Sequence, residues 1–223
     1  MEPIRTSAIV LGCNDYTTSK KIVKLLTPNF GKIECIVTGV SSKKGKIKRA
    51  YLQPSFNLEC IVEKKNESKA LYTLKEFHIK ENYYTIPYDV LKSSQVFFLC
   101  EAIQKLTVED TQQQLLYEFV SNAFQMLDVS DKGAENFHII FLFELLKIQG
   151  YPLSNNEIPL YKTKDIDYKE LNIEDLNFNK ITTLNWNRNI RNQWIELILR
   201  HIEITLNIRF RMKSLSILKQ IFD

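Results

Sequence analysis

A change in hydrophobic periodicity near Pro87 constrains the fold more than any other feature of this 223-residue chain. Before Pro87, short runs rich in Ile, Val and Thr are typical of half-buried β-strands. Beyond it, apolar residues recur at three- and four-residue spacing, which is typical of amphipathic helices. We therefore expect an α+β fold in two modules, a β-module over residues 1–82 and an all-α helical module over residues 83–223.

The β-module contains five short apolar runs separated by turn residues. The runs cover residues 4–13, 20–27, 32–40, 56–63 and 71–79. Gly, Pro, Asn, Asp and Ser cluster between them, as turns require. Because no helical pattern intervenes, the strands predict a small closed barrel. The five-stranded Greek-key OB-fold is a common barrel of this size that binds nucleic acids.

The helical module is dominated by apolar stripes at helical spacing. Two amphipathic stripes lie between residues 90 and 127. The next predicted helix ends at Ile148 and is apolar nearly all round, which favours a place at the centre of the module. Residues 153–180 are polar and acidic and are expected to form an irregular or partly helical insertion. Further helices are expected over residues 189–206 and 214–222.

The distribution of charge along the chain is uneven. Residues 1–80 hold 15 Lys/Arg and 7 Asp/Glu, a net charge of +8. Residues 81–180 have a net charge of −8, with 8 basic and 16 acidic residues, and residues 181–223 have +4, with 7 and 3. The total of +4 conceals this pattern. A basic first module favours a polyanionic partner.

The cysteines and the apolar runs exclude several classes of protein. Four cysteines, at positions 13, 35, 60 and 100, are too widely spaced for a zinc ribbon. No secretory signal is recognisable, so a disulfide framework is not expected. Cys13, Cys35 and Cys60 lie in apolar runs and are expected to be buried thiols. The longest apolar runs are far shorter than the roughly 18 residues of a membrane span. We expect a cytoplasmic protein without a membrane partner.

Motifs for catalysis are sparse. The sequence has no Gly-rich phosphate loop, no Gly-x-Ser-x-Gly and no His-Glu-x-x-His. Acidic pairs at Asp165/Asp167 and Glu174/Asp175 could serve as metal ligands in a nuclease, but no His lies near them in the sequence. A solvated acidic surface is the better interpretation. We therefore expect a protein that is not an enzyme, with no cofactor and no metal site.

A lysine-rich segment between two predicted strands is the best candidate site. Ser41–Arg49 reads S-S-K-K-G-K-I-K-R, and its charges repel one another unless a polyanion such as a nucleic-acid backbone neutralises them. Tyr16, Phe30 and Tyr51 are nearby candidates for base stacking. A solvated hairpin loop is the alternative. The predicted DNA-binding residues are Arg5, Lys20, Lys21, Lys24, Lys43, Lys44, Lys46, Lys48 and Arg49.

A second basic group surrounds the last long helix. An apolar groove rimmed by arginines suits an acidic, hydrophobic peptide tail. Complementing the helix dipole and aiding solubility are equally good explanations. The residues of this predicted tail site are Arg188, Arg191, Trp194, Arg209, Arg211 and Lys213.

In the order and spacing of its short motifs, the chain resembles the DNA repair protein RecO family of bacterial recombination mediators, in the variant typical of Bacteroidetes. The resemblance covers essentially the whole chain. The motifs are Thr6–Leu11 with Tyr16 and Ser19, Ile22–Thr27, Phe30–Lys32, Val37–Val40, Leu52–Pro54, Ile86–Asp89, Lys92–Ser93, Asn136–His138, Gly150–Pro152, Arg191–Asn192, and Lys213–Leu215 with Leu218–Lys219.

The resemblance implies an N-terminal OB-fold followed by a helical domain, which agrees with the periodicity. It implies a non-catalytic mediator that binds single- and double-stranded DNA and anneals complementary strands. It further implies docking to the C-terminal tail of the single-stranded DNA-binding protein, partnership with RecR, and an indirect role in loading RecA, at the nucleoid. An RNA-binding OB-fold protein and a protein-only adaptor are the alternatives.

The chain departs from the family at one point. Many relatives carry a four-cysteine zinc ribbon shortly after the position that matches Gly150–Pro152. Residues 151–223 contain no cysteine, so this metal site is absent. The acidic residues 153–180 stand in its place.

Overall fold

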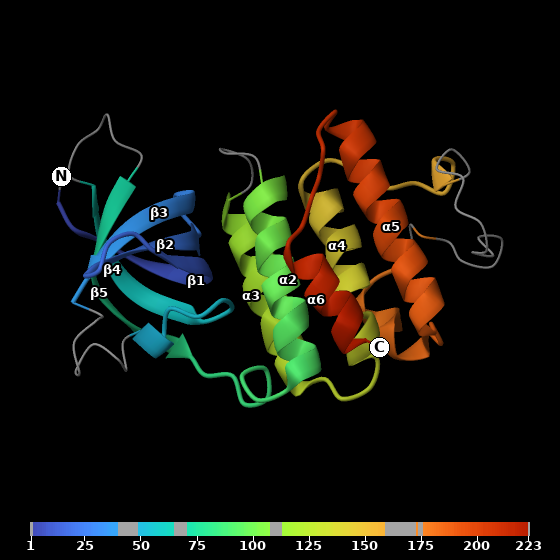
Figure 1. The fold of residues 1–223 in the computed structure, drawn as a ribbon, viewed down its shortest axis with the longest axis horizontal. Coiled ribbons are helices and arrows are strands. Elements are labelled where there is room, and N and C mark those ends of the chain that lie inside the picture. The colour runs from blue at the N-terminus through green and yellow to red at the C-terminus, as the bar shows by residue number, and fades with distance from the viewer. Residues whose placement is uncertain are drawn as a thin grey trace. The chain divides into compact units, whose positions relative to one another are not determined.

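A computed structural model describes residues 2–39, 49–64, 71–107, 113–158, 173 and 176–222 (Figure 1). The chain folds into two compact units that interleave in sequence. The barrel unit comprises Met1–Tyr84 with Cys100–Gln125, and the helical unit comprises Thr85–Leu99 with Met126–Asp223. The module boundary predicted between residues 82 and 83 falls just after the last strand.

The first unit is built on a closed five-stranded barrel of order β1-β2-β3-β5-β4, coloured blue to teal in Figure 1. All neighbouring strands are antiparallel except β3 and β5, which pair in parallel. This mixed barrel confirms the predicted OB-type module and the α+β fold. The strands are β1 (Ile4–Asp15), β2 (Lys20–Thr27), β3 (Gly31–Thr38), β4 (Asn57–Lys64) and β5 (Leu71–Glu81).

Alternation along the strands fills the barrel interior. On β2, Val23 and Leu25 are fully buried while the intervening Lys24 is half-exposed. Cys35 and Cys60 belong to the same interior cluster, and burial raises the pKa of Cys60 to about 12. Both thiols are free, as the apolar runs predict, whereas Cys13 is only half-buried.

Two helices complete the barrel unit. Part of α2 (Val90–Leu106) and most of α3 (Gln113–Val129) belong to it. From α2, the Nε2 of Gln104 donates to the carbonyl oxygen of Leu11 at 2.8 Å, and Lys32 Nζ donates to the Gln104 carbonyl oxygen at 2.8 Å. These bonds fix α2 to β1 and β3.

The helical unit is organised around α4 (Phe137–Ile148), in which nine residues are buried. This confirms the prediction of a central helix that is apolar all round. The 3-10 turn η1 (Ala134–Asn136) precedes it at Gly133, whose φ is 78°. A Cβ on Gly133 would lie 2.7 Å from the carbonyl oxygen of Ile181, so only glycine fits here.

Three further elements belong to this unit, and the last two agree with the helices predicted over residues 189–206 and 214–222. They are η4 (Phe178–Thr183), α5 (Arg188–Thr205) and α6 (Ser214–Ile221). Asn187 caps α5, because its side-chain oxygen accepts a hydrogen bond from the backbone N–H of Ile190 at 3.0 Å. Asp165, Asp167, Glu174 and Asp175 of the acidic insertion lie outside the described residues.

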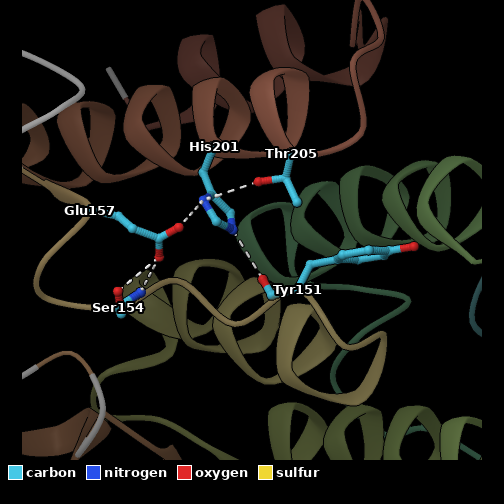
Figure 2. A network of polar contacts seen from close by, with 5 residues as sticks. All are labelled: Tyr151, Ser154, Glu157, His201 and Thr205. Atoms are coloured by element: carbon cyan, nitrogen blue, oxygen red, sulfur yellow. Dashed lines mark hydrogen bonds and ion pairs between the residues drawn. The ribbon is translucent and has the colours of Figure 1, made fainter.

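A polar network holds the start of the α4–α5 connection against α5 (Figure 2). His201 reaches from α5 and donates through Nε2 to the carbonyl oxygen of Tyr151 at 3.0 Å. Its Nδ1 lies 3.5 Å from Thr205 Oγ1 and 3.9 Å from a Glu157 carboxylate oxygen. Glu157 also accepts two hydrogen bonds from Ser154, from its N–H and from its hydroxyl. The Nε2 bond of His201 thus fixes the chain just after α4 to α5.

None of the described helices has the length and apolar character needed to cross a bilayer. Within the described ranges, no three His, Cys, Asp or Glu side chains gather as metal ligands would.

Candidate nucleic-acid and peptide-binding sites

One end of the barrel gathers the described ends of the lysine-rich segment. Lys20, exposed at the start of β2, pairs with Thr38, the last residue of β3, so the chain leaves β3 beside Lys20. At the far end of the segment, exposed Arg49 lies near Asp15 and contributes to lowering the pKa of that carboxyl group, after the larger effect of Lys21. Lys43, Lys44, Lys46 and Lys48 lie outside the described residues.

Two of the predicted lysines already have acidic partners. Lys21 lies on the same face of β2 as the buried Val23 and Leu25 and is only 5% exposed. Its ammonium group forms an ion pair with Asp15. Its hydrogen bond is the main reason why the pKa of Asp15 is lowered. Lys24 Nζ lies 3.6 Å from a Glu34 carboxylate oxygen. Because successive side chains of a strand point to opposite faces, the sequence alone could have shown that Lys21 faces inward with Val23 and that Lys20 does not.

Arg5 lies apart from these lysines. It is exposed near the beginning of β1 and pairs with Ile61 of β4. Asp15, at the other end of β1, pairs with Lys21. The structure therefore places Arg5 and Lys20 at opposite ends of β1, so they do not form one compact patch.

Of the three predicted stacking residues, Tyr16 has the most exposed ring. It is 58% exposed, and its N–H donates to the carbonyl oxygen of Lys20 at 3.0 Å. Phe30 and Tyr51 pack against the barrel interior, and the Phe30 ring lies 6.0 Å from that of Tyr72. Of the predicted residues, Tyr16, Lys20 and Arg49 are exposed at this barrel end, beside the exposed carboxyl group of Asp15.

The predicted tail site divides between core and surface. Trp194 is fully buried and packs against Phe143 and Trp186, with ring centroids 5.6 and 5.7 Å apart. It therefore supports α5 rather than forming a surface. Arg209, Arg211 and Lys213 are exposed on the segment between α5 and α6.

Arg188 and Arg191 line a small pocket beside α5, which we call the α5 pocket. Asn192 and Ile195 continue the same helical face, and the lining also includes His138 of α4 and Phe222 beyond α6. The spacing of Arg188, Arg191, Asn192 and Ile195 predicts a shared face. His138 and Phe222 carry no such signal, because only the tertiary packing brings them there.

Two family profiles and several relatives of this chain point to one family. The family profile described as the recombination protein O N terminal matches residues 1–83, and the profile of the recombination protein O C terminal matches residues 87–157. A DNA repair protein RecO of Flavobacterium psychrophilum is 31% identical, over 99% of this chain and 99% of the relative. The chain belongs to the RecO family.

Other RecO proteins match over similar lengths. That of Christiangramia forsetii is 27% identical, over 98% of this chain and 99% of the relative. That of Bacteroides fragilis strain YCH46 is 25% identical, over the same shares. RecO is a family of non-catalytic recombination mediators, in agreement with the sparse catalytic motifs. The relatives also confirm the resemblance to the Bacteroidetes variant.

Proposed function

We propose that this RecO protein binds the backbones of single- and double-stranded DNA with one end of its barrel. The main support is the position of the two ends of the lysine-rich segment. Thr38, just before it, pairs with Lys20, and Arg49, at its end, lies near Asp15. Four further lysines lie between these two points in the sequence. Exposed Tyr16 adds a ring for base stacking. Contacts of this kind do not read base edges, so binding is independent of sequence.

Annealing follows from the same electrostatics. Lysines that neutralise phosphates release condensed counterions and reduce the repulsion between two complementary strands. Strand pairing then needs no nucleotide hydrolysis. In this role the protein acts at the nucleoid in the cytoplasm, works with RecR, and helps to load RecA on strands covered by the single-stranded DNA-binding protein.

A titration of labelled single-stranded DNA at several salt concentrations tests the barrel site. Replacing Lys43, Lys44, Lys46, Lys48 and Arg49 with Ala is expected to weaken binding across all sequences. The salt slope is expected to flatten by about 0.7 per lost contact. Unchanged anisotropy curves would contradict the proposal, and preference for RNA in competition would favour an RNA-binding role.

Lys20 and Lys24 provide a matched pair on one strand. Lys20→Ala is expected to weaken binding, whereas Lys24→Ala is expected to change it less, since Lys24 is already close to Glu34. Lys21 is nearly buried with Asp15, and we leave it out of the proposed contacts. Arg5, at the far end of β1, stays a predicted contact on a separate part of the barrel.

We also propose that the helical unit binds the acidic C-terminal tail of the single-stranded DNA-binding protein. Arg188 and Arg191 beside apolar Ile195 suit a ligand with a carboxylate and an apolar side chain. Arg209, Arg211 and Lys213 extend the basic surface toward α6. Loss of peptide binding in an Arg188→Ala/Arg191→Ala variant tests this site, and retained binding would exclude it.

A further inference from the structure

The α5 pocket contains a buried hydrogen-bond acceptor. Gln95 Nε2 donates to the carbonyl oxygen of Ala134 at 2.9 Å, so Gln95 Oε1 must accept the two bonds from His138. These come from the backbone N–H at 3.0 Å and from ring Nδ1 at 2.9 Å. Nδ1 therefore carries the proton in the neutral ring, and Nε2 presents a lone pair.

His138 Nε2 has no hydrogen-bond partner among the described residues, and His138 is 1% exposed. Burial, with a smaller effect of Arg191, lowers the pKa of His138 to about 3. The ring is therefore neutral at physiological pH, and Nε2 remains an acceptor. A group that enters the pocket satisfies this atom only by donating, as a peptide N–H does.

A half-buried guanidinium lies beside this acceptor. Arg191 Nη1 donates to the carbonyl oxygen of Trp186 at 2.6 Å, while the buried Nε has no hydrogen-bond partner in the described part of the chain. Arg188 and Lys219 line the same pocket, and Lys219 pairs with Glu196 at 2.9 Å. The site therefore combines positive charge, an acceptor and apolar walls.

One wall of the α5 pocket is an aromatic side chain from the end of this same protein. The Phe222 ring lies 5.1 Å from the His138 ring, at an interplanar angle of 43°. Its centroid is also 5.1 Å from Cζ of Arg191. A phenyl ring cannot donate to Nε2 and does not neutralise Arg191. It leaves His138 Nε2 without a donor and meets Arg191 only through a cation–π contact.

The helix that carries Phe222 has few buried anchors. Leu218 is the one buried residue of α6, and Ile217 is 57% exposed. The Lys219–Glu196 pair joins α6 to α5 on the surface, where ion pairs contribute little. Moving α6 away therefore uncovers the pocket without breaking the core around Trp194.

We propose that α6 and Phe222 form a removable plug in the α5 pocket, which is displaced by a peptide ending in an apolar residue with a free carboxylate. The incoming side chain replaces Phe222, its N–H donates to His138 Nε2, and its carboxylate approaches Arg188 and Arg191. The identity of this peptide as the tail of the single-stranded DNA-binding protein rests on the proposed function. The plug itself rests on the packing of Phe222.

The test compares Phe222→Ala with Ile217→Ala, a matched change on an exposed face of the same helix. A fluorescent peptide of the single-stranded DNA-binding protein tail is titrated into each full-length protein. Phe222→Ala is expected to bind about tenfold more tightly than the unchanged protein, because a larger fraction of its pockets is open. Ile217→Ala is expected to bind like the unchanged protein. Equal or weaker binding by Phe222→Ala would overturn the plug.

A second probe separates the plug from the identity of the partner. A labelled peptide of residues 214–223 is added to a Leu218→Ala/Phe222→Ala protein, in which α6 competes poorly. Binding supports the plug, and absence of binding overturns it. If this peptide binds while the tail peptide binds neither protein, the plug stands and the proposed tail partner is wrong. Hydrogen exchange of α6 should accelerate when the tail binds.

Discussion

At the scale of single residues, burial decides which ionisable groups a binding partner can reach. Lys20 and Lys21 are neighbours, yet Lys20 is exposed and Lys21 is nearly buried in an ion pair with Asp15. His138 and His78 show the same contrast. His138 lies inside the helical unit, whereas the His78 side chain is 68% exposed on β5. Residue type alone therefore does not define a binding surface.

His138 makes the stability of the helical unit depend on pH. Its folded pKa of about 3 is below the ordinary histidine value of 6.5, so the unfolded chain binds a proton first as the pH falls. Stability is full above pH 6.5 and decreases toward pH 3, by up to about 1.4 kcal/mol per pH unit. His138→Asn removes the titration and is expected to flatten this dependence.

Urea unfolding at a series of pH values measures the effect. Asn keeps a donor toward Gln95, and the loss of ring packing is expected to lower stability at every pH. His78→Asn serves as the control and should retain the slope of the unchanged protein. An equally steep slope in His138→Asn would show that another group causes the dependence.

At the scale of elements, a buried asparagine joins β4 to α3 within the barrel unit. Asn57 is fully buried, and its side-chain oxygen accepts a hydrogen bond from the Tyr117 hydroxyl at 2.9 Å. Its Nδ2 donates to Ser121 Oγ at 3.1 Å and to a Glu81 carboxylate oxygen at 3.3 Å. One residue therefore ties two strands and a helix together.

Asn57→Ala is expected to destabilise the barrel unit by about 1–3 kcal/mol, because Tyr117 and Ser121 lose a partner in a buried place. Chemical denaturation monitored by tyrosine fluorescence and circular dichroism gives the value. Asn14→Ala, at an exposed position of β1, is the control and should change stability by less than about 0.5 kcal/mol. Equal effects of the two changes would contradict the role of Asn57.

At the scale of the whole molecule, the two compact units are not continuous segments. Cys100–Gln125 belongs with the barrel, although residues 85–99 belong to the helical unit. Ile9, Leu11 and Leu26 are buried but are not part of the barrel's interior cluster. One of these three, Leu11, accepts a hydrogen bond at its backbone carbonyl from the side chain of Gln104 on α2. The helical part of the barrel unit thus covers one outer side of the barrel.

A fragment of residues 1–83 is therefore expected to expose this apolar surface. We expect it to bind a hydrophobic dye and to unfold at lower urea than a fragment of residues 1–125, which holds the whole barrel unit. Dye fluorescence and urea melts measure both properties. Equal midpoints for the two fragments would show that the barrel needs no helical cover.

The sequence predicts those features that depend on local periodicity. Short runs rich in Ile, Val and Thr, separated by turn residues, predicted the five strands, and the run that is apolar nearly all round predicted the central place of α4. The burial of Trp194 could also have been foreseen, since it shares a face with Leu197 and Ile198. The pairing of His138 with Phe222 could not, because these residues are far apart in sequence and share no repeat. The lysine-rich segment stays a prediction.

Closure of the barrel limits how any macromolecule can attach to it. Each strand has a neighbour on both sides, with β3 and β5 completing the ring through residues 34–36 and 71–73. Because the ring of described strands is closed, none of these strands stands at the open edge of a sheet, where a strand from another chain could be added. Proteins that dock on this ring must therefore be recognised by its side chains and connecting segments, and swapping of strands between copies is disfavoured.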